Sequence, residues 1–306
     1  MKSLIIGNGI DIQFGGMEQR GNSAIMRRVI SNVQSDKYCK IGMKKEEVES
    51  IIQVCTDVFN KIISYSIEIP DTYLFLQIEL ERIRKSYKKN ITFEEIGLED
   101  LLICTEVLYH YCNNDEERQE CISAVRDYIT PIIIDAIFDD GNVNEIYRKF
   151  PKKFIQYLKS YDAIFTLNYD TNIESAIGDI VPVYHIHGCF DDYVDRADNV
   201  GDEFKHMFCN GILSWYWLEK YGKESEDKRY HIEALNNIED RIDILGISPC
   251  NDEQLYLRLS QNTKLKRCNY YYLKKGEAIE IRKHLGGNIR NHVTDVDVKK
   301  FWKKMS

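Results

Sequence analysis

Residues 1–16 read MKSLIIGNGIDIQFGG, and they decide how the rest of the chain is interpreted. Leu4–Ile6 have the apolar, partly β-branched character of a buried parallel strand, so the chain is expected to turn at Gly7–Gly9. A glycine turn after such a strand can cradle a phosphate. The third glycine of the usual phosphate-binding pattern is replaced by Ile12, so a plain tight turn is the alternative prediction.

The chain has a negative net charge. The 306 residues carry 41 Lys and Arg against 49 Asp and Glu, a formal net charge of −8. No direct binding of nucleic acid is expected, because phosphate neutralisation needs clustered cations. The runs Lys152-Lys153 and Lys299-Lys300…Lys303-Lys304 are predicted to be solvated faces. No apolar stretch is long enough for a bilayer and the first strand is too short for a signal peptide, so a cytoplasmic protein without a membrane partner is expected.

Nine cysteines are scattered through the chain without any Cys-x-x-Cys spacing. This distribution argues against a thioredoxin-type motif and against a four-cysteine zinc ribbon. Reduced thiols, most of them small core residues, are predicted, and no metal is expected.

Residues 20–160 are predicted to form a helical block. Apolar residues at three- and four-residue spacing, typical of amphipathic helices, occur in segments 46–66, 72–87, 98–112, 116–138 and 143–161. Pro131 is expected to kink the fourth segment, and the cluster at 139–142 to end it.

From Asp162 onward, short apolar runs alternate with stretches of helical spacing. Strands are predicted within 163–167, 181–187, 241–248, 269–274 and 288–294, and helices within 171–177, 251–262, 276–285 and 295–305. Such alternation indicates an α/β fold, here a Rossmann-like, mainly parallel sheet with a large helical insertion after its first strand. The predicted domains are 1–19 with 161–306 for the sheet, and 20–160 for the insertion.

Ligands of such sheets bind at the carboxyl ends of the strands, so the residues after each strand are the candidate site. Four predicted strand ends carry glycine or polar residues: Gly7, Asn8, Gly9 and Asp11; Asn168, Tyr169 and Asp170; His187 and Gly188; and Gly246, Ser248, Asn251 and Asp252.

Four motifs in this order resemble those of the sirtuin-like superfamily. They are GNGID at 7–11, TLNYDTNIE at 166–174, YHIHG at 184–188 and LGISPCNDEQL at 245–255. GNGID also resembles the opening of the AbiH-type phage abortive-infection proteins within that superfamily. The resemblance covers the first sixteen residues and about 162–275, and leaves the helical block unmatched.

The resemblance implies a pocket for NAD, with Asn168 and His187 as catalytic residues. The turn Gly7–Gly9 would accept the pyrophosphate, and Asn168 and Asp170 would approach the nicotinamide ribose beside His187. The stretch Gly246–Ser248 would face the other phosphate and ribose, with Asn251 and Asp252 nearby. Asn8 and Asp11 stand where protein-deacylating sirtuins have Ala and Ser, which would alter how the nicotinamide end is held.

Protein-deacylating sirtuins carry two Cys-x-x-Cys pairs for a structural zinc, and their absence from this sequence puts a protein-deacylating activity in doubt. The resemblance then favours an NAD glycohydrolase that acts as an abortive-infection effector. The alternative is a catalytically silent nucleotide-binding sensor or scaffold within a defence complex. The helical insertion is the expected surface for a homo-oligomer or a partner protein.

Each site residue also has a plainer interpretation. His187 can be a core histidine, and Asn168 to Asp170 can cap a helix. His185 lies on the same strand face as His187, so a two-histidine metal site is conceivable. Cys189 beside His187 has the residue types of a Cys/His nucleophile, without an orienting partner in the sequence.

Overall fold

The computed structural model describes residues 1–68, 74–88, 90–124, 128–186, 235–249, 253–285, 289 and 292–306. The chain divides into two compact units. The described residues of the first unit, which contains the sheet, lie within 1–16 and 140–306, and those of the second, helical unit lie within 17–139.

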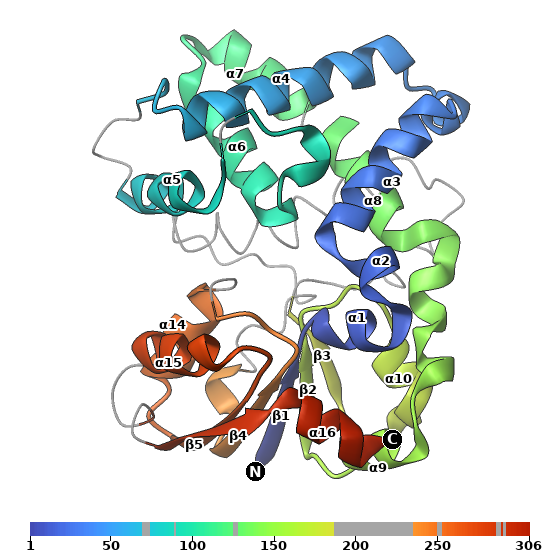
Figure 1. The fold of residues 1–306 in the computed structure, drawn as a ribbon, viewed down its shortest axis with the longest axis vertical. Helices are drawn as coiled ribbons and strands as arrows, with labels where there is room; N and C mark the ends of the chain where they lie inside the picture. Colours follow the sequence, from blue (N-terminus) through green and yellow to red (C-terminus); the bar gives the residue numbers. More distant parts are fainter. Residues whose placement is uncertain are drawn as a thin grey trace. The chain divides into compact units, whose positions relative to one another are not determined.

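The first unit is built on a six-stranded parallel sheet (Figure 1). Its strands are β1 (Lys2–Ile6), β2 (Ala163–Thr166), β3 (Val183–His185), β4 (Asp240–Leu245), β5 (Leu265–Tyr272) and β6 (Val293–Asp297). Every pairing is parallel, and Ile5 of β1 lies between Phe165 of β2 and Ile244 of β4. The predicted Rossmann-like α/β fold is therefore confirmed.

The strand order places a topological switch point beside β1. The order is β3-β2-β1-β4-β5-β6, so the chain leaves β1 toward one edge and later returns to build the other half next to it. In open α/β sheets the ligand crevice opens at the carboxyl ends of the strands where the order reverses. Here those are the ends of β1 and β4.

Helices cover both faces of this sheet. They are α1 (Gly9–Gly15), α9 (Lys152–Leu158), α10 (Asn172–Ile177), α14 (Glu253–Gln261), α15 (Lys275–His284) and α16 (Val298–Met305), with 3-10 helices η4 (Asp139–Lys149) and η5 (Gly178–Ile180). The predicted helix at 295–305 is wrong at its start, because residues 295–297 end β6. Asp297 instead caps α16, and its carboxylate accepts from the amides of Lys299 and Lys300.

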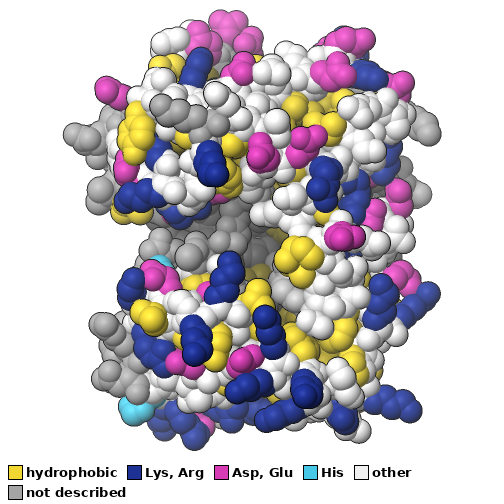
Figure 2. Space-filling view, in the orientation of Figure 1, with side chains coloured by type: hydrophobic (Ala, Val, Ile, Leu, Met, Phe, Trp, Pro, Cys, Tyr) yellow, Lys and Arg dark blue, Asp and Glu magenta, His cyan; other side chains and the backbone are white. Residues whose placement is uncertain are grey.

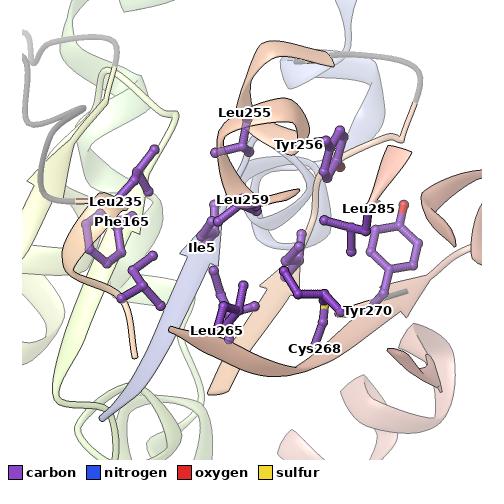
Figure 3. Packing of buried hydrophobic residues seen from close by; sticks show 14 of the residues in the cluster. Ile5, Phe165, Leu235, Leu255, Tyr256, Leu259, Leu265, Cys268, Tyr270 and Leu285 are labelled. Atoms are coloured by element: carbon purple, nitrogen blue, oxygen red, sulfur yellow. The ribbon is translucent and has the colours of Figure 1, made fainter. Parts of the chain in front are cut away.

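One face of the sheet packs an aliphatic core against α14 and α15 (Figure 3). Ile5 and Phe165 from the strands meet Leu255 and Leu259 of α14, all of them buried. The opposite face packs aromatic rings from α1, α9 and α16. Phe154 lies 5.2 Å from Trp302 between ring centroids. Burial on both faces explains the nearly continuous apolar runs of the central strands.

The second unit is entirely helical in its described part. Its helices are α2 (Met17–Arg20), α3 (Asn22–Gln34), α4 (Lys45–Ile63), α5 (Leu74–Ser86), α6 (Leu98–Tyr111), α7 (Asp115–Ala124) and α8 (Thr130–Phe138), with 3-10 helices η1 (Lys37–Ile41) and η2 (Phe93–Glu95). Its buried apolar side chains include Phe59, Leu80, Leu101 and Val107.

Two boundaries differ from the sequence-based expectation. The fourth predicted helix is two helices, α7 and α8, with Pro131 in the first turn of α8, where a missing amide costs nothing. Residues 140–158 belong to the sheet unit, so the boundary lies near 140 rather than 160. Their helical spacing reflects packing against the sheet, since Phe154 of α9 contacts Trp302.

The cysteines within the described residues are free thiols. Cys55, Cys104 and Cys268 are buried in the cores of the two units, as small core residues are.

Candidate functional site

The turns after β1 and β4 are bonded to each other. The amide of Gly7 donates to the carbonyl oxygen of Leu245 over 3.1 Å, and the amide of Gly9 donates to that of Gly246 over 2.9 Å. Gly246 has a φ of +75°, a left-handed backbone that favours glycine. Backbone hydrogen bonds therefore hold together the turns after β1 and β4 at the switch point.

The close contact between the two turns explains why glycine is required at positions 7 and 9, which the sequence alone did not show. A Cβ on Gly9 would lie 2.5 Å from the Cα of Gly246, and a Cβ on Gly7 would lie 2.6 Å from a side-chain carbon of Ile247. The turn therefore needs glycine at both positions for contacts within the protein. Phosphate binding by Gly7–Gly9 stays a prediction, and the amide of Gly9 is already bonded to Gly246.

Behind this turn lies a buried polar cluster formed by Asp11, Asn168, Asp170 and Asn172. Asp11 is 4 % exposed in the first turn of α1, and Asn168 and Asp170, which follow β2, are 9 % and 3 % exposed. The side-chain amide of Asn168 donates to Asp11 Oδ2 over 3.0 Å. This hydrogen bond links two residues that are 157 positions apart in the sequence.

Burial of this polar cluster shifts the pKa of Asp170. Burial raises the pKa of Asp170 above its ordinary value, while the side chain of Asp11, the backbone amide of Asn172 and the charge of His185 act in the opposite direction. Asp170 therefore keeps its proton to a higher pH than an exposed aspartate does.

Asp170 also shapes the chain that follows it. Its Oδ1 accepts from the amide of Asn172 over 2.9 Å at the start of α10. This bond makes an Asx-turn just before the helix, and Asp170 is not the cap, because the N-cap residue of α10 is Thr171. Asn172 is held in turn, since its side chain donates to the carbonyl oxygen of Val143 over 2.8 Å and accepts from the amide of Tyr147 over 3.0 Å.

His185 supports the polar cluster from β3. Its Nδ1 lies 3.0 Å from the carbonyl oxygen of Asn168, and its Nε2 lies 2.5 Å from Glu174 Oε1. Both contacts form when the ring donates from both nitrogens, as an imidazolium opposite the Glu174 carboxylate. His185 thus orients the backbone that carries Asn168. In the part of the chain that the structure describes, no group of three or more His, Cys, Asp or Glu side chains could hold a metal ion.

The remaining predicted residues fall into two groups. Asn8 and Ser248 are exposed at the ends of β1 and β4, beside Gly246. His187, Asn251, Asp252, Gly188 and Cys189 lie outside the described residues.

Sequence reasoning did not assign roles to Asn172 and Glu174. Both belong to the TNIE stretch of the second motif, at the start of α10. Their polar side chains on the first turn after a strand end were the available signal.

Among the helices of the described part, none has the length and apolar character needed to cross a bilayer. Comparison of the chain with protein-family models, curated proteins and solved structures found no match.

Proposed function

We propose that this protein is a sirtuin-like NAD glycohydrolase, which cleaves NAD to nicotinamide and ADP-ribose and acts as an abortive-infection effector. The observation that carries the proposal is the buried polar cluster of Asp11, Asn168 and Asp170 at the carboxyl ends of β1 and β2. Titratable groups perturbed by burial at a strand-end crevice are typical of functional sites.

The residue types suit the reaction. The bond between the ribose C1′ and the nicotinamide nitrogen breaks with its electron pair moving to nicotinamide, and the sugar becomes oxocarbenium-like. Carboxylates and oriented amide dipoles stabilise that positive charge. Water then adds to C1′ and gives its proton to a base.

Asn168 is suited to orient the ribose or the attacking water. Its side-chain NH2 group donates to Asp11, and its side-chain oxygen forms no hydrogen bond with another described residue. That oxygen is a ready acceptor for a hydroxyl or water. The resemblance assigns the role of base to His187.

The switch point supports NAD as the substrate class. Dinucleotides lie across the crevice where the strand order reverses, with phosphates near the turn after the first strand. The exposed Asn8 and Ser248 stand at the two strand ends there and offer polar groups to the phosphates and the second ribose.

A nucleotide-binding scaffold without turnover is the second candidate. It is favoured by the bonds that Asp170 and Gly9 already make within the protein, to Asn172 and Gly246. A scaffold needs a stable pocket edge and no reactive group.

Nicotinamide release from NAD tests the proposal, with purified protein and with cells that produce it. Asn168→Ala is expected to lower the rate about 100-fold or more, because one positioned hydrogen-bonding group is lost. Asn60→Ala is the matched control. Asn60 donates to the carbonyl oxygen of Ile91 over 3.0 Å in the helical unit, so its loss lowers stability but not turnover per folded molecule.

NAD in excess should also raise the melting temperature of the Asn168→Ala protein. Thermal stabilisation of the wild type by NAD without nicotinamide release, in the test tube and in cells, would select the scaffold. Neither stabilisation nor release would overturn both candidates.

A further inference from the structure

Two lysine runs that are far apart in the sequence lie side by side in the sheet unit. Phe154 of α9 packs on Trp302 of α16, and Tyr157 packs on Phe301 with ring centroids 4.9 Å apart. The Nζ of Lys153 donates to the carbonyl oxygen of Ser306 over 3.3 Å. The aromatic residues face inward, so the lysines between them face solvent.

We define the lysine face as the six exposed lysines of these two helices: Lys152, Lys153, Lys299, Lys300, Lys303 and Lys304. Lysine and arginine side chains gather along the lower edge of Figure 2, where Figure 1 draws α9 and α16. None of the six forms an ion pair with another described residue. Segments 148–161 and 298–306 contain no Asp or Glu at all.

The carboxylates next to these segments are engaged elsewhere. Asp297 accepts from two backbone amides of α16, Asp162 accepts from the backbone amide of Lys2 over 2.6 Å, and Glu145 pairs with Arg148 over 2.6 Å. Among the described residues, the six lysines therefore have no Asp or Glu partner, although the net charge of the whole chain is negative.

Lys303 and Lys304 stand in the last turn of α16, where cations are favourable, but the other two lysines of this helix are placed unfavourably. Lys299 and Lys300 stand in the first turn of α16, at the positive end of the helix dipole. Lys299 with Lys303 and Lys300 with Lys304 are like-charge pairs at four-residue spacing, which repel each other. Residues that destabilise their own helix are common at functional positions. Here a bound anion would relieve the repulsion between the lysines.

We propose that the lysine face binds the phosphate backbone of a nucleic-acid duplex, without reading its base sequence. Two columns of lysine spaced one helical turn apart present ammonium groups to a regular row of phosphates. Lysine acts as a point charge on phosphate, and the six side chains that define the face include no arginine, asparagine or glutamine.

A membrane surface is less well matched. An interfacial helix buries an apolar face in the lipid, but Phe301 is 6 % exposed and Val298 is 8 % exposed because α16 buries its apolar face against its own unit. From the net charge of −8 alone, no nucleic-acid binding is expected and these lysine runs are predicted to be solvated faces. The proposal revises that expectation, since a local patch rather than the average charge attracts a polyanion. The inference is independent of the NAD glycohydrolase proposal.

Fluorescence anisotropy of labelled duplexes tests this directly. Two unrelated duplexes of about 20 base pairs should bind the full chain equally at about 50 mM salt, with affinity falling steeply as salt rises. If about four phosphates are contacted, the slope of log affinity against log salt is about −3.6. Absence of binding at low salt, or a strong preference for one sequence, would overturn the proposal.

Charge-removing variants locate the surface. Lys299→Gln, Lys300→Gln, Lys303→Gln and Lys304→Gln together should weaken binding at least about tenfold and reduce the salt slope by about one for each phosphate that is no longer neutralised. A second variant on the other helix, Lys152→Gln with Lys153→Gln, should reduce the slope by up to about two. It decides the question if the α16 variant does not fold.

The matched control removes four exposed lysines from the helical unit, at Lys44, Lys61, Lys85 and Lys88. It changes the net charge equally, and its salt slope should equal that of the wild type. An equal loss of binding in this control would show a general charge effect and contradict the proposal. So would binding to anionic vesicles, or self-association in sedimentation, without duplex binding.

Discussion

Asp243 and Asp170 are both buried carboxyl groups of the sheet unit, but their surroundings are opposite. Asp243, fully buried on β4, accepts from Arg241 over 2.9 and 3.0 Å, from Asn269 over 2.7 Å and from the hydroxyl of Tyr161. Asp170, 3 % exposed, has the amide of Asn172 and a second carboxyl group, Asp11, as its partners.

The difference separates a structural network from a candidate site. Around Asp243 a guanidinium balances the charge and donors use the carboxylate oxygens, which is the arrangement of a stable buried ion pair. Around Asp170, burial without a directly bonded cation raises its pKa, which is the arrangement expected where a proton is to be held. Burial is therefore common to both carboxyl groups, and what distinguishes Asp170 from Asp243 is that no cation is bonded directly to it.

The largest effect is expected from Asp243→Ala. The variant leaves Arg241, Asn269 and Tyr161 without their acceptor, and should lower the free energy of unfolding by about 3 kcal/mol or more. Urea denaturation measures this. The control is Glu239→Ala, which removes an exposed pair with Lys264 and should change stability little. Equal stability of the two variants would contradict the structural role of the Asp243 network.

The joined turns predict a smaller loss. Gly9→Ala places a Cβ against the backbone of Gly246 and should cost about 1–3 kcal/mol, whether or not a nucleotide is bound. Gly276→Ala in α15 meets nothing within 4 Å and should instead stabilise by up to about 1 kcal/mol. Thermal denaturation without ligand compares them. A Gly9→Ala protein as stable as the wild type would mean that the turn glycines are reserved for a ligand.

The smallest effect is a pH dependence. Because the pKa of Asp170 is raised in the folded state, its contribution to stability is complete at acidic pH and is lost as pH rises through the folded value. Asp170→Asn mimics the protonated carboxyl group. Its stability relative to the wild type should therefore grow from about pH 4 upward, by about 1.4 kcal/mol for each pH unit until the folded pKa is reached. A difference independent of pH would contradict the raised pKa of Asp170.

The sheet was predictable and the cluster partners were not, for physical reasons. Leu4–Ile6 and Ala163–Phe165 show their burial through apolar runs, which indicate a strand without knowledge of its neighbours. The bond from Asn168 to Asp11 depends on which strands pair, and β1 pairs with β2 across an insertion that carries no strand signal. Likewise, Gly9 is recognisable as a turn glycine, but its contact with Gly246 appears only once β1 and β4 are adjacent.

Asp170 is assigned here to function and Asp243 to the fold, and one paired measurement tests that assignment. Nicotinamide release and melting temperature are recorded together for Asp170→Asn and Asp243→Asn, which make the same chemical change at both buried sites. We expect Asp170→Asn to lose turnover by about 100-fold or more, because an amide cannot ionise to the carboxylate that stabilises the oxocarbenium-like sugar. Its melting temperature should not fall, because the amide mimics the protonated carboxyl group. Asp243→Asn should melt at a lower temperature and keep its turnover per folded molecule. Retained turnover in Asp170→Asn, with turnover lost in Asp243→Asn, would contradict the assignment.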